Sequence, residues 1–256
     1  MKQAFKQHYK LYLMEALGLA IFMISACFFA GFFESPSSIA HQLISADARH
    51  LLNGLLMGAT ALFIFYSPFT SPSGAHINPA VTITFWRLGK INRYDTFFYI
   101  LFQFLGGTIA VYVMAFLMKG MLTAPPVNYA VTVPGEYGKW VALFTEFAIA
   151  FMMISMVLFT SSSNTLKKYT KIFAACIVSL YVIFAGPVSG FGMNPARSFA
   201  SAFPAHNYTA LWIYLTAPIA GMLAAAEFYL LCHKSEVAGR LKLAGMHMYH
   251  PHKMKN

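Results

Sequence analysis

Long apolar stretches separated by short polar segments dominate this chain. An α-helix needs about 20 apolar residues to cross the hydrocarbon core of a bilayer. Six stretches come close to or exceed that length, at residues 11–33, 51–67, 96–118, 140–160, 172–186 and 211–231. The pattern therefore predicts six transmembrane helices, of which the fifth is short. Two apolar-flanked segments, 77–88 and 193–204, are left over and are too short to cross a membrane.

The two left-over segments contain the same tripeptide, Asn-Pro-Ala. Its copies are Asn78, Pro79, Ala80 and Asn194, Pro195, Ala196. Asparagine is a preferred N-cap, and proline is preferred at the first helical position, where its missing N–H costs nothing. Each copy thus predicts a short helix that begins within the membrane. Irregular backbone at that depth is tolerated where it is buried in protein or lines a cavity, so the pair indicates the functional centre.

The two halves of the chain resemble each other beyond the tripeptide. Glu15 opens the run EALGLAIFMIS in the first span, and Glu146 opens EFAIAFMMIS in the fourth. Small residues also recur in the third and sixth spans, at Gly106, Gly107 and Gly221, and small residues let helices approach closely.

Each half runs span, span, Asn-Pro-Ala segment, span. Three spans are an odd number, so the halves must insert with opposite orientation. We expect an all-α membrane protein of six transmembrane helices plus two half-helices in an inverted repeat, with its site near the midplane. The whole chain, 1–256, is predicted to be one channel domain, with repeats at about 11–119 and 140–231 and a tail at 232–256.

Composition supports the membrane assignment. The chain is 58% hydrophobic and only 10% charged, and its mean hydropathy is +0.59, whereas soluble domains carry about 25% charged residues. The net charge of +10 could suggest a nucleic-acid partner. Most Lys and Arg residues, however, fall on one side of the predicted topology, in segments 2–10, 87–93, 167–171 and 234–255. Positive charge collects in the cytoplasm, so we predict a multi-pass protein of the cell membrane with both termini cytoplasmic and no nucleic-acid role.

The paired half-helices also predict a chemistry. Two helix N-termini that meet at the centre carry about half a positive charge each, together with unpaired N–H groups. Such a site repels cations, including hydronium, while the amides of Asn78 and Asn194 orient a neutral solute. The sequence contains no nucleophile–base or metal-ligand constellation, so we predict no enzyme activity, no metal and no cofactor.

These motifs identify a resemblance. The run HINPAVT, from His76 to Thr82, and the run NPARS, from Asn194 to Ser198, match the signatures of the aquaporin and glycerol-facilitator family, the major intrinsic proteins. The resemblance implies a homotetramer in the lipid bilayer with one pore per subunit. It also implies that Arg197 lies at the outer constriction, where it donates to solute and repels cations.

Other constriction positions depart from the pattern of that family. Where water-selective members carry a histidine this chain has Val182, and Phe191 is an aromatic residue as in glycerol facilitators. The position of the large aromatic in span two falls on Met57 or Gly58. Losing the histidine and that aromatic should widen the pore. We therefore expect a passive channel for water and other small neutral solutes; a facilitator that prefers glycerol, urea or ammonia is the alternative.

Buried polar groups in the spans allow a second alternative, a proton-coupled secondary transporter. Transporters use intramembrane carboxylates such as Glu15 and Glu146. The symmetric placement of this pair instead favours a structural role, accepting hydrogen bonds from the backbone N–H groups of the two loops. Gln103 is predicted to satisfy the same backbone. His76 is predicted to be a packed, hydrogen-bonded side chain, with a pore-facing, pH-sensitive group as the alternative.

Overall fold

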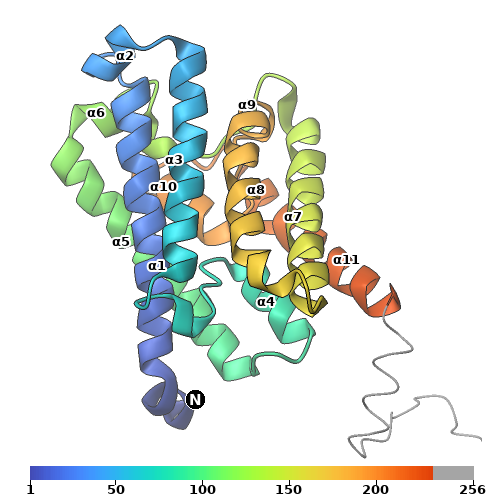
Figure 1. Ribbon diagram of the computed structural model, residues 1–256. Coiled ribbons are helices and arrows are strands. Elements are labelled where there is room, and N and C mark those ends of the chain that lie inside the picture. The colour runs from blue at the N-terminus through green and yellow to red at the C-terminus, as the bar shows by residue number, and fades with distance from the viewer. Residues whose placement is uncertain (233–256) are drawn as a thin grey trace, which may run out of the picture.

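The computed structural model describes residues 1–232 of the chain, and these residues form helices joined by loops, with no strand among them (Figure 1). Five helices are long and apolar enough to cross a membrane: α1 (Lys2–Glu34), α3 (Ala46–Tyr66), α5 (Arg93–Met118), α7 (Gly138–Ser162) and α11 (Leu211–Cys232). The predicted fifth span is α8 (Thr170–Phe184), which has only 15 residues and is followed at once by the single turn α9 (Gly186–Ser189). The tail 233–256 lies outside the described residues.

Both predicted half-helices are present. The first is α4 (Pro79–Arg87) and the second is α10 (Pro195–Ala205), so each begins at the proline of its tripeptide. The side chain of Asn78 accepts a hydrogen bond from the Ala80 N–H at 2.9 Å. The side chain of Asn194 accepts one from the Ala196 N–H at 3.0 Å. The sequence rule for a helix start is thus obeyed at both places.

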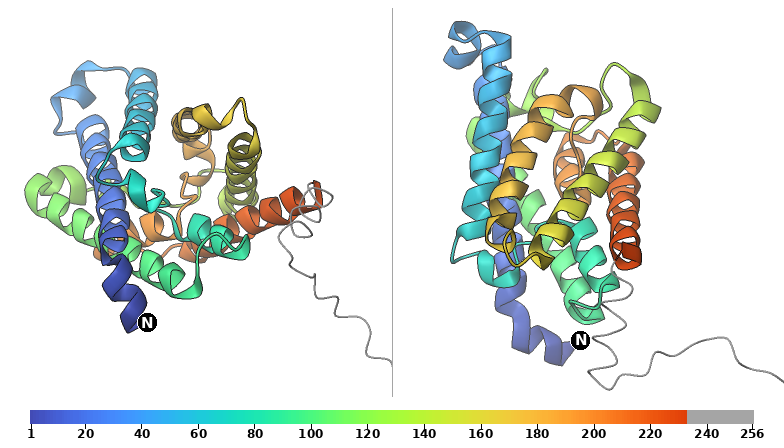
Figure 2. Two further views of the ribbon diagram at one scale, coloured as in Figure 1. Left: turned by 60° about the horizontal axis from the view of Figure 1, so that its bottom comes forward. Right: turned by 45° about the vertical axis from the view of Figure 1, so that its right-hand side comes forward.

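Short elements complete the ends of the bundle: α2 (Ile39–Leu43), α6 (Gly120–Thr123), η1 (Ser71–Ser73), η2 (Asn128–Ala130) and η3 (Lys167–Tyr169). Helices α2 and α9 lie at the upper end in Figure 1. The N-terminus and the end of α11 lie at the lower end, as the right-hand view of Figure 2 also shows. The connection between α7 and α8, which includes η3, lies at the lower end as well. The basic segments 2–10 and 167–171, which were predicted to lie on one side of the membrane, are therefore at the same end of the bundle.

Two helix pairs make very close contacts, one in each half of the chain. A Cβ built on Gly106 of α5 would lie 2.2 Å from the carbonyl oxygen of Ala16 on α1. A Cβ built on Gly221 of α11 would lie 2.3 Å from the carbonyl oxygen of Phe147 on α7. Glycine is required at both places, because any other residue would overlap the backbone of the partner helix.

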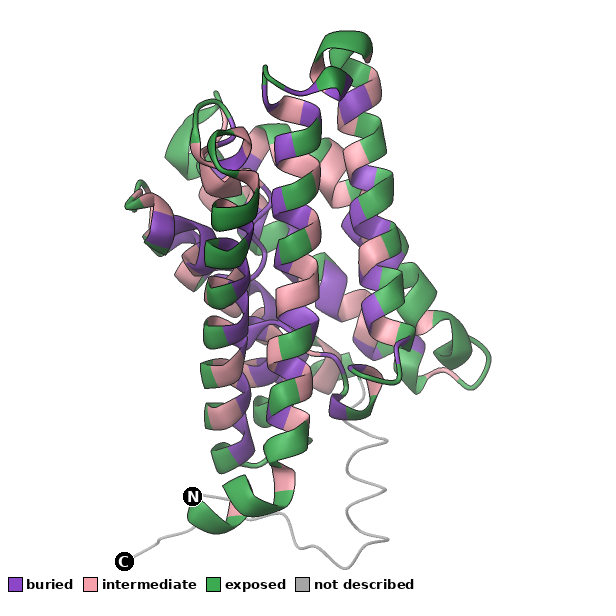
Figure 3. Cartoon of the chain, turned by 90° about the vertical axis from the view of Figure 1, so that its left-hand side faces the viewer, coloured by how far each residue is buried: buried purple, intermediate pink, exposed green. Residues whose placement is uncertain are grey.

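The outer surface of the bundle is exposed and largely apolar. Figure 3 shows exposed positions along the outward faces of the helices, with buried positions turned inward. Large apolar side chains such as Phe116, Phe144 and Phe184 are 70% or more exposed. A soluble monomer seldom presents such an extensive apolar surface, whereas a membrane protein turns it toward lipid.

Candidate functional site

A cavity of about 530 Å³ runs through the bundle between its two ends. At the upper end in Figure 1 it is lined by His50 and Asn53 of α3 and by Gly186 of α9. At the lower end it is lined by Thr170 and Lys171 at the start of α8. Both Asn-Pro-Ala segments contribute lining residues between these ends.

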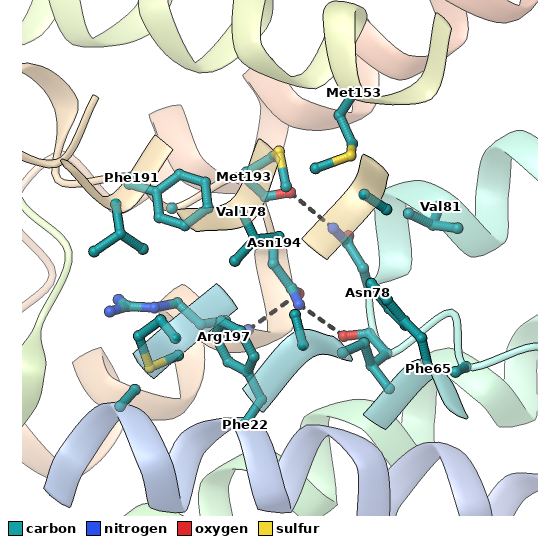
Figure 4. Close-up of a pocket in the computed structure, with 18 of the residues that line it drawn as sticks. Phe22, Phe65, Asn78, Val81, Met153, Val178, Phe191, Met193, Asn194 and Arg197 are labelled. Atoms are coloured by element: carbon teal, nitrogen blue, oxygen red, sulfur yellow. Dashed lines mark hydrogen bonds between the residues drawn. The ribbon is translucent and has the colours of Figure 1, made fainter. Parts of the chain in front are cut away.

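The two tripeptides meet in the cavity and bond to each other (Figure 4). Asn78 Nδ2 donates to the carbonyl oxygen of Met193 at 2.8 Å, and Asn194 Nδ2 donates to the carbonyl oxygen of Ile77 at 2.7 Å. A primary amide has two N–H groups, so each asparagine retains one for a solute. The N-termini of α4 and α10 therefore face the same point, one from each half of the chain.

The loops reach this point through an unusual backbone conformation that repeats in both halves. Ile77 has φ 42° and Met193 has φ 44°; two residues earlier, Ala75 has φ 47° and Phe191 has φ 46°. Positive φ costs a non-glycine residue about 1–2 kcal/mol. Each loop therefore needs partners that hold it in place.

Glu15 is the partner of the first loop. Its Oε1 accepts from the His76 N–H at 3.0 Å, and its Oε2 accepts from the Ile77 N–H at 2.6 Å. The Ser73 hydroxyl also donates to Oε1 at 2.6 Å. The side chain is 0% exposed, so these bonds are made without competition from water.

Glu146 does the same for the second loop. Its Oε1 accepts from the Gly192 N–H at 2.8 Å and its Oε2 from the Met193 N–H at 2.5 Å. The Ser189 hydroxyl donates to Oε1 at 2.7 Å. The two carboxylates thus bond to equivalent atoms of the two loops, which is the hydrogen bonding that the sequence repeat predicts for them.

The prediction for Gln103 is wrong in its target. Its Nε2 donates to Glu15 Oε2 at 2.8 Å and to the Thr82 hydroxyl at 3.1 Å, not to the loop backbone. Glu15 already accepts from the two N–H groups of the loop within reach. The amide of Gln103 therefore fixes the carboxylate, and only through it the loop.

Two tyrosine hydroxyls also support the two loops, and they were not predicted from the sequence. Tyr99 of α5 donates from its hydroxyl to the carbonyl oxygen of Ser73 at 2.9 Å, and Tyr214 of α11 donates to that of Ser189 at 2.6 Å. The sequence does mark the two serines as equivalent, because each lies five residues before the asparagine of its tripeptide.

His76 lies against the wall of the cavity. Its Nδ1 is 3.2 Å from the Thr82 hydroxyl, and its ring stacks on Phe85 with a centroid distance of 4.9 Å. This is the packed, hydrogen-bonded state predicted for it, although the side chain also lines the cavity.

The cavity brings together four of the five residues proposed for the constriction: Met57, Val182, Phe191 and Arg197. Gly58 is the exception, and its assignment was wrong. A Cβ built on it would lie 2.7 Å from Ser179 Cβ and 3.1 Å from the Ala175 carbonyl oxygen, so it faces α8. Of the two candidates, Met57 is the one that lines the cavity, because neighbouring positions on a helix point about 100° apart.

The side chain of Arg197 is held by a loop that contains no recognised sequence motif. Its Nη1 donates to the hydroxyl of Thr132, which lies in the loop between η2 and α7. The Ser198 hydroxyl also donates to Thr132 Oγ1, at 3.3 Å. Thr132 is buried, and nothing in the local sequence distinguishes it from other loop residues.

No group of three or more His, Cys, Asp or Glu residues that could hold a metal ion is found within residues 1–232. The polar groups at the centre of the cavity are amides, carbonyl oxygens and a guanidinium group. These groups can donate hydrogen bonds to a solute or accept them from it, and none of them is a nucleophile with a neighbouring base.

Comparisons with known proteins agree with this geometry. The model of the family described as "Major intrinsic protein" matches residues 3–229. A probable NIP-type aquaporin of Nicotiana alata is 36% identical over 166 residues, which are 64% of this chain and 59% of that relative. A probable TIP-type aquaporin of Nicotiana tabacum is 32% identical over 216 residues, 83% of this chain and 82% of the relative.

The fold is also similar to a solved structure. The X-ray structure of the aquaglyceroporin from Plasmodium falciparum superposes with a TM-score of 0.75. The match covers 90% of this chain and 99% of that chain, at 20% sequence identity. At this identity the likeness demonstrates a shared fold, and the fold class predicted from the sequence is confirmed.

Proposed function

This chain belongs to the major intrinsic protein family, a family of membrane channels and not of enzymes, and on that basis we propose that its cavity is a passive pore. The pore conducts water and other small neutral solutes and excludes ions and protons. The crossed hydrogen bonds between Asn78 and Met193 and between Asn194 and Ile77 carry this proposal.

These bonds support charge exclusion because they bring two helix N-termini to one point of the cavity. Each N-terminus presents about half a positive charge at that point, and Arg197 adds a full charge to the lining. A cation would lose water of hydration and meet positive potential. Water or another neutral solute meets N–H donors instead, so it passes at a lower cost.

The geometry favours a passive pore over the proton-coupled alternative. Glu15 accepts four hydrogen bonds and Glu146 accepts three. Neither carboxylate is among the described residues that line the cavity. Hydrogen bonds from loop N–H groups favour the charged form of a carboxylate, and protonation weakens them, so both fit a structural role better than a coupling role.

The constriction supports a broad selectivity among neutral solutes. Three of its four members, Met57, Val182 and Phe191, are apolar, and Arg197 is the one hydrogen-bond donor among these side chains. Apolar walls accommodate the carbon skeleton of glycerol, whereas a strict water pore needs more donors and a narrower opening. Glycerol, urea and ammonia are the solutes that we propose beside water.

Orientation, membrane and assembly are proposed on the same basis. The end of the bundle that carries the N-terminus also carries the basic residues of 87–93 and 167–171, so we place it in the cytoplasm. The cell membrane is the proposed location. The exposed apolar faces of the bundle suit both lipid contact and a homotetramer with one pore per subunit.

Stopped-flow measurements on proteoliposomes test the proposal. We expect the purified protein to raise the permeability to water, glycerol and urea above that of empty vesicles, without any effect of an imposed proton gradient. A protein that conducts water but excludes glycerol, urea and ammonia would contradict the broad selectivity. A flux that follows the proton gradient would instead support the coupled transporter.

Val182 offers a direct test of what sets that selectivity. In Val182→His the added ring narrows the constriction and supplies a polar group, so we expect the glycerol-to-water permeability ratio to fall about tenfold, or ~1.4 kcal/mol. Val182→Ile is the matched control, because it adds a similar volume without a hydrogen-bonding group. An unchanged ratio in the histidine variant would remove Val182 from the selectivity filter.

A further inference from the structure

Helix α3 presents one continuous stripe to the cavity, and the stripe changes character along its length. Its members are His50, Asn53, Met57 and Ala61, which recur at the spacing of one helix face. The first two are polar and the last two are apolar. Asn53 stands one turn above Met57, about 6 Å along the helix axis, and His50 about 10 Å above it. We call His50 and Asn53 the upper polar pair.

The side-chain amide of Asn53 forms no hydrogen bond with another group within residues 1–232. The other polar side chains that line the cavity each have a hydrogen-bond partner in the protein: His50, His76, Asn78, Thr170, Lys171, Asn194 and Arg197. Within residues 1–232, no such partner is found for Asn53. A polar side chain in the cavity without an internal partner is available to a passing solute.

His50 complements this amide. Its Nε2 lies 2.7 Å from the carbonyl oxygen of Ile183, close to the end of α8. A carbonyl oxygen only accepts, so Nε2 must carry the hydrogen. In the neutral ring Nδ1 is then an acceptor. No hydrogen bond to Nδ1 is found in the described part of the chain, so this acceptor also remains open.

We propose that the upper polar pair is a binding subsite for urea and small primary amides. This proposal rests on the pore function proposed above. His50 and Asn53 are three residues apart on one helix face, where Cβ atoms lie about 5–6 Å from each other. Their two acceptors, His50 Nδ1 and Asn53 Oδ1, suit an NH₂ group, which donates two hydrogen bonds from one atom. A hydroxyl group donates only one, so a polyol needs two of its hydroxyl groups to satisfy both acceptors.

The other end of the same solute has a partner deeper in the cavity. The guanidinium of Arg197 has five N–H donors, and its Nη1 bond to Thr132 uses one of them. The carbonyl oxygen of urea or an amide can accept from the remaining donors. An amide whose NH₂ group binds the acceptors on α3 would turn its carbonyl oxygen toward the constriction, where Arg197 of α10 lines the same cavity.

The test compares solutes in the same proteoliposomes at one fixed pH. The variants are Asn53→Leu and His50→Phe, each close in size to the residue it replaces. Leu52→Ala, at the exposed neighbouring position of α3, is the control. Permeabilities to water, glycerol, urea and acetamide are measured by stopped flow.

We expect each variant to lower urea and acetamide permeability three- to tenfold, the effect of about one lost hydrogen bond. Glycerol and water permeabilities should change less than twofold, and the control should match the wild type. Equal losses for urea and glycerol, or no loss for either, would overturn the subsite. So would loss of water permeability in both variants, because the pair would then hold the fold. A wild-type protein that conducts no water would instead refute the pore itself.

Discussion

Gly106→Ala is expected to prevent the chain from forming a stable bundle. The added methyl group would lie 2.2 Å from the carbonyl oxygen and 2.6 Å from the Cα of Ala16. Both atoms belong to the backbone of α1, so no side chain can rotate away to relieve the overlap. Overpacking commonly costs about 1–3 kcal/mol and occasionally more, and a backbone overlap belongs at the upper end of that range.

The damage should reach the pore because Ala16 adjoins Glu15. When α1 moves away from α5, the carboxylate that holds the first loop moves with it. Gly221→Ala should act in the same way in the second half, where the methyl group would lie 2.3 Å from the carbonyl oxygen of Phe147, next to Glu146. The measurement is the fraction of protein that stays monodisperse in mild detergent on heating.

Gly120→Ala is the matched control for both variants. A Cβ at Gly120 has no neighbour within 4 Å, so the same chemical change should leave the fraction of monodisperse protein unaltered. If Gly106→Ala and Gly221→Ala behave like Gly120→Ala, the helix pairs tolerate a wider spacing, and close approach is not what holds the two halves.

Glu146→Gln is the second change with a large expected effect. Glutamine can keep one acceptor oxygen, but its NH₂ group must face one of the N–H groups of Gly192 or Met193. A buried donor left without an acceptor costs about 1–3 kcal/mol, and the facing donors repel each other. The second loop should therefore lose its fixed conformation, and the yield of folded protein and its water permeability should fall together.

Glu227→Gln provides the comparison, because it removes a carboxylate from an exposed ion pair. Glu227 Oε1 lies 2.7 Å from Arg87 Nε, and both side chains are half-exposed. Such pairs contribute about 0–1 kcal/mol, so this variant should fold and conduct like the wild type. If Glu146→Gln assembles normally and shows a new pH dependence of flux, Glu146 is a coupling group and not a loop support.

The sequence predicted the half-helices well because their signals are local. An asparagine cap followed by proline specifies a helix start within a few residues, and the structure obeys that rule at Pro79 and Pro195. The spans were equally readable, since a long apolar run has few structural alternatives in a bilayer. Only their ends differ, as in α1, which begins at Lys2 and not at residue 11.

Hydrogen-bond partners were less predictable because they depend on distances between separate helices. The repeat marked Glu15 and Glu146 as supports for the loops, but not the competition that directs Gln103 to Glu15. Likewise, the sequence left the constriction position of span two open between Met57 and Gly58. Packing against α8 settles it, because Gly58 faces that helix while Met57 faces the cavity.

The membrane class, the inverted repeat and the positions of the two polar helix starts can all be read from the sequence. Apolar length and capping preference are properties of neighbouring residues, and internal similarity is found by comparing two segments of the sequence. All three can therefore be recognised before the fold is known. The packing of the helices and loops, in contrast, fixes which side chains share the cavity and what holds them. It attached Arg197 to Thr132 and left Asn53 without a partner in the described chain. Those relations arise where segments distant in the sequence meet, and no local pattern encodes the distance across such a contact.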